Sequence, residues 1–466
     1  MKGVNAAVAA VLIGTAFAVP APSPVELDKR QSPSGVFSAL NAVDTAFAGV
    51  LNGVAADASE ASQIFSAALT AVEDTIKAQA TARPSNVEQA VSVVSSILTP
   101  QPTNLYKNIV QLAANGLGPS ASDFNLLVVG SLVGPNSENN LNLRSPAQPI
   151  YPKKSSTDAP YSLTEAQLRR VIYIPPAFTY GSKSPVILVP GTGNTGYESF
   201  SGNYIPLLTG VSYADPVWLN IPEQFLGDAQ INSEYITYAI NYISGISSSK
   251  NVTVLAWSQG GLDTQWALKY WPSTRGVVSN FIANSPDFHG TVLAYAVCPS
   301  FPNIPCSPAI IQQEYNSNFV TTLRRNGGDS AYVPTTTIFS STDEIVQPQS
   351  PVTGASAFLN DARNVGVSNN QVQAICGGRP AGLVYTHEGV LYNPLGVALA
   401  MDVLRNGGPG RIDRINLDVV CNQIVGTGLG LNNVVLTEKA IGIAAVRILL
   451  EDNKVFDEPG IKGYAA

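Results

Sequence analysis

One serine stands where an apolar run gives way to a helix-forming run. Ser258 lies in the segment VTVLAWSQGGLDTQWAL, at residues 252–268. A nucleophilic serine on a tight strand-to-helix turn needs small residues two positions away on each side, because such a turn is strained. Ala256 and Gly260 occupy these positions. The pattern predicts a serine that attacks acyl groups; the alternative is a structural serine at the start of a helix.

A serine nucleophile needs a base, and the chain has only two histidines. In folds that carry the serine on such a turn, the triad follows the chain order Ser, then Asp or Glu, then His. His387 comes after the apolar run at residues 383–385, which fits a base on a loop after a strand. His289 precedes the best acid, so we interpret it as a packing or surface histidine.

The acid of the triad should lie between Ser258 and His387 in the sequence. Asp343 directly follows the β-branched run at residues 335–339, where a strand is expected to end. Its neighbour Glu344 is the one serious rival. We therefore predict Ser258, Asp343 and His387 as the catalytic residues.

Short β-branched runs alternate with helical stretches after about residue 155, and these elements must position the three residues. Buried runs of this kind favour a mostly parallel sheet with helices on both faces. Functional residues in such sheets gather at the carboxyl ends of the strands. The sequence therefore predicts an α/β architecture. The predicted strands are residues 186–189, 252–256, 281–283, 335–339 and 383–385.

The start of the chain has the features of a secretory signal. Residues 1–18 contain an early lysine, an apolar stretch and a small-x-small cleavage site. Residues 19–30 form a candidate propeptide spacer that ends in a dibasic pair, which is either a processing site or two solvated charges. We expect a secreted, extracellular protein.

The region before the predicted sheet divides into two parts. Residues 31–117 are rich in Ala, Ser and Val with helical spacing, and we predict helices over 36–54, 64–76, 87–98 and 105–112. Ser85 and Glu88 have the spacing of a capping box for the third helix, and Gly116 ends the fourth. Residues 118–155, rich in Gly, Pro, Asn and Ser, are interpreted as a linker or an extended wrap. The main domain then spans residues 156–466.

Composition limits the partners. The net charge is −7 and the pI about 5.0, so no basic surface is available for nucleic acid. No later apolar run is long enough to span a bilayer. We expect a soluble monomer that binds no nucleic acid.

The cysteines fit an oxidising compartment. Cys298, Cys306, Cys376 and Cys421 allow three connectivities, and proximity in sequence favours Cys298–Cys306 and Cys376–Cys421. With no CxxC spacing and two histidines, a zinc site is not favoured. We expect no metal and no other cofactor.

Four segments closely resemble the fungal lipases related to Candida antarctica lipase B. They are VPGTGNTG at residues 189–196, WSQGG at 257–261, Asp287 within SPDFHGTVLA, and TDEIVQPQ at 342–349. The motifs are colinear from about residue 155 to residue 451. The resemblance implies an α/β-hydrolase that cleaves carboxylic esters through an acyl-enzyme, and we expect a triacylglycerol lipase.

The same resemblance assigns further residues. It implies an oxyanion hole at Thr192 and Gln259, and polar residues near the acyl pocket at Asp287 and Gln313. Cys376–Cys421 matches a disulfide of the family, whereas Cys298–Cys306 would close a segment where relatives have a mobile helix. We hypothesise that this second disulfide limits lid motion or narrows the entrance to the site.

The sequence leaves several alternative functions open. A non-catalytic secreted protein that binds a surface is one, and a carboxylesterase, polyesterase or acyltransferase of the same fold is another. The expected substrate is an apolar ester, with a lipid–water interface as a candidate partner. The sequon at Asn251 is a candidate glycosylation site.

Overall fold

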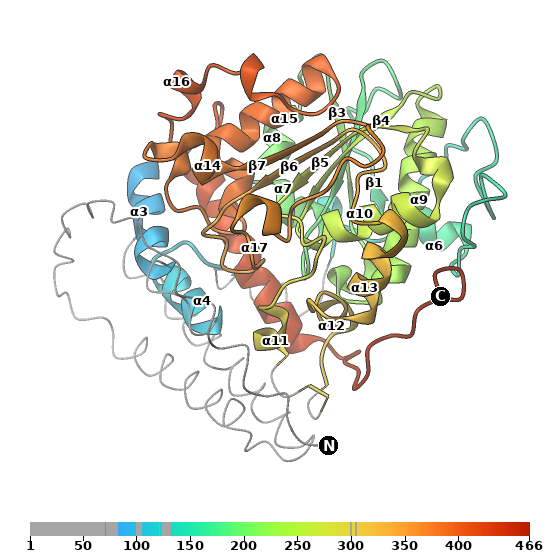
Figure 1. Cartoon of the computed structure of the whole chain (residues 1–466), viewed down its shortest axis with the longest axis horizontal. Helices are drawn as coiled ribbons and strands as arrows, with labels where there is room; N and C mark the ends of the chain where they lie inside the picture. The colour runs from blue at the N-terminus through green and yellow to red at the C-terminus, as the bar shows by residue number, and fades with distance from the viewer. Residues whose placement is uncertain are drawn as a thin grey trace.

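The computed structural model describes Thr70 and residues 83–98, 105–120, 122–123, 132–298, 301–302 and 305–466 (Figure 1). The predicted signal peptide (1–18), the candidate spacer (19–30) and the helix expected over 36–54 lie outside the described residues. The helix expected over 64–76 lies outside them too, apart from Thr70, which is helical.

A seven-stranded sheet forms the centre of the molecule (Figure 1). The strands are β1 (Ile172–Tyr173), β2 (Pro185–Val189), β3 (Asp215–Leu219), β4 (Val252–Trp257), β5 (Val278–Asn284), β6 (Thr335–Phe339) and β7 (Val367–Gln371). Their order across the sheet is β1-β3-β2-β4-β5-β6-β7, and only β1 runs antiparallel to its neighbour. The carboxyl ends of β2, β4, β5 and β6 therefore meet at one edge.

Helices surround the sheet and fill the connections between strands (Figure 1). They are α3 (Val87–Leu98), α4 (Leu105–Ala114), α6 (Glu165–Arg170), α7 (Gly196–Phe200), α8 (Tyr204–Leu208), α9 (Ala229–Ile246), α10 (Gln259–Tyr270), α11 (Ala294–Val297), α12 (Pro308–Gln312), α13 (Asn318–Arg324), α14 (Val372–Cys376), α15 (Pro394–Asn406), α16 (Leu417–Val420) and α17 (Leu431–Leu450).

Each face of the sheet has its own apolar core, because successive side chains of a strand point to opposite faces. Val186 and Leu188 of β2 pack with α8, α15 and α17. Ile187 and Val189 of the same strand pack with α6, α9 and α10. Burial of both faces explains why β2, β4 and β6 are nearly continuous runs of apolar and β-branched residues. The predicted α/β architecture is confirmed.

Four of the five predicted strands are confirmed, as β2, β4, β5 and β6. The prediction for residues 383–385 is wrong, since this segment forms no strand. The hydroxyl of Thr342 donates to the Tyr385 carbonyl (2.9 Å) and accepts from the Tyr385 N–H (3.0 Å), so a side chain takes the place of a strand partner. The seventh strand, β7, is formed instead by the polar sequence VSNNQ.

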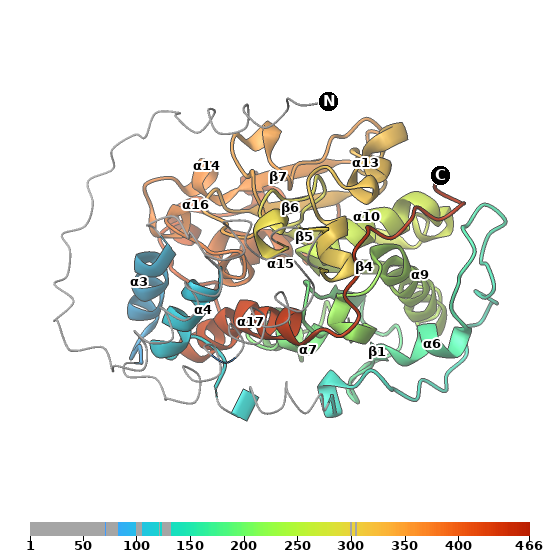
Figure 2. The ribbon, with the colours of Figure 1, turned by 90° about the horizontal axis from the view of Figure 1, so that it is seen from below.

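Two N-terminal helices pack on α17 (Figure 2). Val94 of α3 and Leu112 of α4 share an apolar cluster with Val434. Both helices lie where the sequence predicted them. The predicted cap has a different partner, however, because Ser85 N–H donates to the side chain of Gln89 (2.9 Å) and not to Glu88.

Residues 132–155 follow the surface of the sheet domain. The Asn142 amide donates to the carbonyls of Arg169 (2.9 Å) and Ile172 (2.8 Å), and the Tyr242 hydroxyl donates to the Arg144 carbonyl (2.6 Å). These bonds join the segment to α6, β1 and α9.

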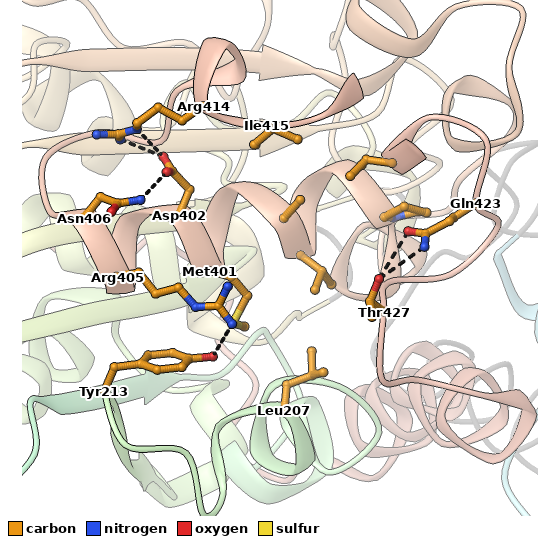
Figure 3. Close-up of a pocket in the computed structure, with 14 residues that line it drawn as sticks. Leu207, Tyr213, Met401, Asp402, Arg405, Asn406, Arg414, Ile415, Gln423 and Thr427 are labelled. Carbon is orange, nitrogen blue, oxygen red and sulfur yellow. Dashed lines mark hydrogen bonds and ion pairs between the residues drawn. The ribbon is translucent and has the colours of Figure 1, made fainter. Parts of the chain in front are cut away.

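A pocket of about 530 Å³ lies beside α15 (Figure 3). Apolar residues such as Leu207 and Met401 line it, and Tyr213 and Arg405 lie together on one side. None of the predicted site residues lines this pocket. It is therefore separate from the candidate site.

Candidate active site

Ser258 occupies a sharp turn between β4 and α10. Its backbone angles are φ 57° and ψ −132°, a strained combination for a residue with a Cβ. A Cβ added to Gly260 would lie 2.4 Å from the Pro190 carbonyl oxygen, so the turn leaves no space for a side chain there. This close approach is the physical reason for the small residue after the serine.

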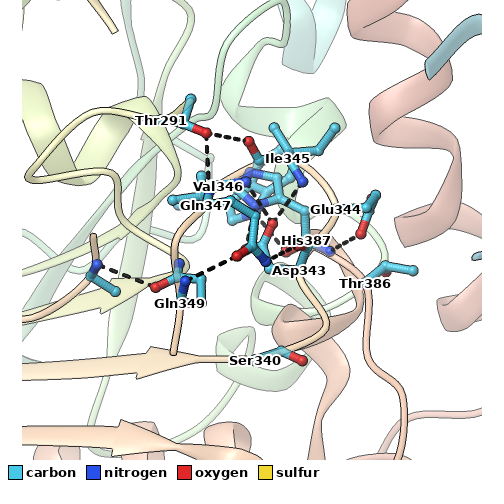
Figure 4. Close-up of polar contacts among 12 residues, drawn as sticks. Thr291, Ser340, Asp343, Glu344, Ile345, Val346, Gln347, Gln349, Thr386 and His387 are labelled. Atoms are coloured by element: carbon cyan, nitrogen blue, oxygen red, sulfur yellow. Dashed lines mark hydrogen bonds and ion pairs between the residues drawn. The ribbon is translucent and has the colours of Figure 1, made fainter. Parts of the chain in front are cut away.

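Asp343 and His387 contact each other directly (Figure 4). The Nδ1 atom of His387 lies 2.9 Å from Oδ2 of Asp343, and the two residues are 1% and 2% exposed. The other oxygen, Oδ1, accepts the N–H groups of Ile345 (2.9 Å) and Val346 (2.7 Å). Main-chain donors and the imidazole thus fix the orientation of the carboxylate.

Glu344 has a different contact. Its Oε2 accepts the backbone N–H of His387 at 2.9 Å, whereas the ring of His387 faces Asp343. Of the two acids that the sequence left as candidates, Asp343 contacts the imidazole and Glu344 holds the main chain of the same histidine.

The His387 loop also contacts the serine strand. The indole N–H of Trp257 donates to the carbonyl of His387 at 3.1 Å, and the two rings lie 5.1 Å apart. Trp257 directly precedes Ser258, so this contact brings the His387 loop next to the Ser258 turn. Among the described residues, no hydrogen bond joins Ser258 Oγ to the imidazole. Such bonds are often long in unliganded enzymes.

The charges around His387 favour its protonated form. Burial lowers the pKa of His387. The charge and hydrogen bond of Asp343 raise it, as do the charges of Glu344 and Asp287, and the net result is a pKa above the ordinary value. An ion pair with Asp343 would therefore stabilise the imidazolium that forms when His387 takes a proton.

Asp287 is completely buried, and neither carboxylate oxygen has a hydrogen-bond partner. Burial raises the pKa of Asp287 to about 7. At mildly acidic pH this side chain is thus a neutral acid with an unused donor, which suits contact with a polar atom of a ligand.

Thr192, Gln259 and Gln313 form one polar group. The Thr192 hydroxyl lies 2.8 Å from Gln259 Oε1 and 3.2 Å from Gln313 Oε1, and the Gln313 amide donates to Gln259 Oε1 at 3.2 Å. Gln259 is the first residue of α10, so its backbone N–H has no acceptor within the helix. The two predicted oxyanion-hole residues therefore lie together at the carboxyl ends of β2 and β4.

The remaining predicted residues lie as follows. The disulfides join Cys298 to Cys306 and Cys376 to Cys421, the pairs that sequence proximity favoured. Asn251 is exposed and directly precedes β4. His289 is half-buried, and burial lowers its pKa to about 4, consistent with a packing residue.

Sequence reasoning missed the contacts made by Trp257 and the role of Glu344 as a main-chain acceptor. It also gave no role to Glu438, whose carboxylate accepts the Tyr392 hydroxyl (2.6 Å) behind the His387 loop. The position of Trp257 next to the serine was the only available signal, since the other contacts depend on the fold.

Two further features, a metal site and a membrane span, are absent from the described residues. No cluster of three or more His, Cys, Asp or Glu side chains in the described ranges could hold a metal ion. No helix within the described part of the chain is long and apolar enough to cross a bilayer.

The mostly parallel sheet, with a strained serine turn at the carboxyl end of β4, is the fold of the α/β-hydrolases. Lipase B of Pseudozyma antarctica, also called Candida antarctica, is 38% identical over 255 residues, which are 54% of this chain and 70% of that protein. The crystal structure of Aspergillus fumigatus lipase B superposes with a TM-score of 0.80 at 45% identity, covering 92% of this chain and all of the other. No family model matches the chain.

These similarities identify the family. The chain belongs to the fungal lipase B family and is a carboxylic ester hydrolase of the α/β-hydrolase fold. The resemblance found in the sequence motifs is confirmed.

Proposed function

We propose that this enzyme is a triacylglycerol lipase in which Ser258, Asp343 and His387 form the catalytic triad. The observation that carries the proposal is the buried hydrogen bond between Asp343 and the His387 ring, on a loop that contacts the residue preceding Ser258. The strained turn at Ser258 supports its role as the nucleophile.

The reaction follows from these positions. Neutral His387 takes the proton of Ser258 Oγ through Nε2 while the serine oxygen attacks the ester carbonyl. Asp343 holds the ring through Nδ1 and stays ionised. The imidazolium then protonates the departing alcohol, which leaves an acyl-enzyme on Ser258. Water activated by His387 hydrolyses the acyl-enzyme and frees the fatty acid.

The negative charge that develops on the carbonyl oxygen needs donors. In the proposal, the N–H groups of Thr192 and Gln259 and the Thr192 hydroxyl bind this oxyanion. The hydroxyl must turn from the Gln259 side chain, which it contacts in the unliganded enzyme, toward the substrate. Asp287 and Gln313 are proposed to contact the acyl group.

The proposed setting is extracellular. Two disulfides fit an oxidising compartment, and residues 1–18 have the composition of a signal peptide. We propose that the enzyme is secreted, acts as a monomer at a lipid–water interface and carries a glycan on the exposed Asn251. We also propose residues 31–117, 118–155 and 156–466 as helical region, linker and lipase domain.

Hydrolysis of p-nitrophenyl esters with short to long acyl chains tests the proposal when the enzyme is compared with Ser258→Ala. We expect activity in the parent enzyme that rises toward longer chains and is lost in the variant. A preference for short chains would indicate an esterase. Activity in Ser258→Ala equal to that of the parent enzyme would contradict the triad.

A further inference from the structure

Arg447 of α17 is a buried arginine for which the reaction described above has no role. Its side chain is 7% exposed, and its guanidinium forms a bidentate (two-pronged) salt bridge with the carboxylate of Glu198 in α7. The Nη1 atom also donates to the carbonyl of Gly193 at 3.0 Å. Buried charges are normally paired, but here one donor binds the main chain of a loop as well.

That loop connects β2 to α7 and contains Thr192. Gly193 has φ +71°, and a Cβ there would lie 2.7 Å from the Cα of Ala444, so the loop packs directly on the α17 backbone. The Asn194 amide donates to the carbonyls of Thr192 (3.0 Å) and Ala440 (3.2 Å). The conformation of Thr192 is therefore tied to the position of α17.

Glu198 connects Arg447 to the far end of the same loop. Its Oε2 accepts the N–H of Thr195 at 2.9 Å, and the Thr195 hydroxyl accepts the Glu198 N–H at 3.2 Å. This reciprocal cap fixes the start of α7. One guanidinium thus holds the loop both at Gly193 and, through Glu198, at its end.

We propose that Arg447 is a positioning residue for the oxyanion hole: it fixes the β2–α7 loop so that the backbone N–H of Thr192 already faces the developing oxyanion and only the Thr192 hydroxyl has to rotate. The inference rests on the function proposed above, since it takes Thr192 as an oxyanion donor. Donors that are held in place before reaction need no reorganisation, and a misplacement of about 1 Å can cost about 100-fold in rate.

The test uses Arg447→Met and Arg447→Lys in the full chain, with rates expressed per active site titrated with a fluorescent phosphonate. For Arg447→Met we expect kcat on p-nitrophenyl butyrate to fall by about 10- to 100-fold with KM changed by less than about twofold. Arg447→Lys keeps the positive charge but not the planar arrangement of donors, so it should recover part of the loss. The Ki of a trifluoromethyl ketone, whose adduct places an oxyanion in the hole, should rise with the loss of kcat/KM.

A merely structural role gives a different result. It would lower the melting temperature and the titratable fraction but leave kcat per site and the ketone Ki at the parent values, which would overturn the inference. If Arg447→Met yields no titratable protein, Glu198→Gln provides the same comparison, because it weakens the two-pronged contact and keeps the Gly193 bond. Arg405→Met, at an exposed arginine of the separate pocket beside α15, is the control and should change none of these values.

The titration separates this inference from the function on which it rests. Phosphonate that fails to label the parent enzyme, or that labels Ser258→Ala equally well, would contradict the proposed triad. Normal labelling with unchanged kinetics in the Arg447 variants would contradict only the positioning role.

Discussion

The two turns that present the proposed nucleophile and base are held in different ways. Ser258 is held by main-chain contacts, since its N–H donates to the Asn284 carbonyl (3.0 Å) and its carbonyl accepts from Gly261 (2.7 Å). His387 is held by acidic side chains, with Asp343 on its ring and Glu344 on its N–H. Steric changes should therefore disrupt the first turn, whereas pH and charge should affect the second.

More carboxyl groups lie behind the second turn. Glu388 follows His387 in the sequence, and Glu438 of α17 accepts the Tyr392 hydroxyl at 2.6 Å. Burial raises the pKa of both Glu344 and Glu438 to about 7 and that of Glu388 well above its ordinary value. These groups give His387 a titratable environment. The proposed site therefore combines two halves: a steric half at Ser258, which the main chain holds, and an electrostatic half at His387, which carboxyl groups hold.

The largest effect is expected from Asp343→Asn. An amide in place of the carboxylate favours the wrong tautomer of His387 and cannot stabilise the imidazolium, so kcat should fall by about 10,000-fold. Steady-state hydrolysis of p-nitrophenyl butyrate measures this loss. A loss of less than about tenfold would show that another acid, such as Glu344, supports the base.

Gly260→Ala tests the steric half. The new methyl group would lie 2.4 Å from the Pro190 carbonyl oxygen, and the backbone would have to move. We expect a loss of about 1–3 kcal/mol in unfolding free energy and about 100-fold in kcat. Gly276→Ala is the control, because a Cβ there meets no atom within 4 Å. Equal stability and activity of the two variants would show that the turn tolerates a side chain.

Glu344→Gln tests the electrostatic half. The amide oxygen can still accept the His387 N–H, but the negative charge that raises the pKa of His387 is lost. The pKa of His387 should fall, so the acid limb of the kcat/KM profile should move to lower pH. An unchanged acid limb with unchanged kcat would show that the charge of Glu344 does not affect His387.

A smaller effect is expected from Glu438 on the pH dependence of the unfolding free energy. Because the pKa of Glu438 is about 7 in the folded protein and near 4.5 ordinarily, the native state binds more protons between these values. The unfolding free energy should therefore fall as pH rises from about 4.5 to about 7, with an upper limit of about 3 kcal/mol from this group. Glu438→Gln cannot ionise and keeps an acceptor for Tyr392.

Melting temperatures at pH 5 and pH 8 test this prediction. The drop between the two pH values should be smaller in Glu438→Gln than in the parent enzyme, whereas the exposed Glu88→Gln should behave like the parent. A drop of the same size in both variants would show that Glu438 does not titrate in this range.

The same two halves differ in what the sequence could predict. The Ser258 turn was predictable because a buried β-branched strand, a serine and small neighbours are local features. The strand expected at residues 383–385 was wrong, since its apolar pattern could not reveal that the Thr342 hydroxyl takes the place of a partner strand. β7 was missed because its polar sequence lies at the edge of the sheet.

Long-range charge pairs were also beyond the sequence. Arg447 and Glu198 are 249 positions apart, and their contact depends on how α17 packs against the β2–α7 loop. An arginine in the apolar second part of α17, residues 440–450, indicates a buried partner, but only the fold supplies its identity.

The most direct test of the account is to locate the adduct of a p-nitrophenyl phosphonate by mass spectrometry of the digested enzyme. We expect one phosphonyl group per molecule, on Ser258, with complete loss of esterase activity and no adduct in Ser258→Ala. A stoichiometric adduct on any other residue, or full activity after Ser258 is labelled, would contradict it.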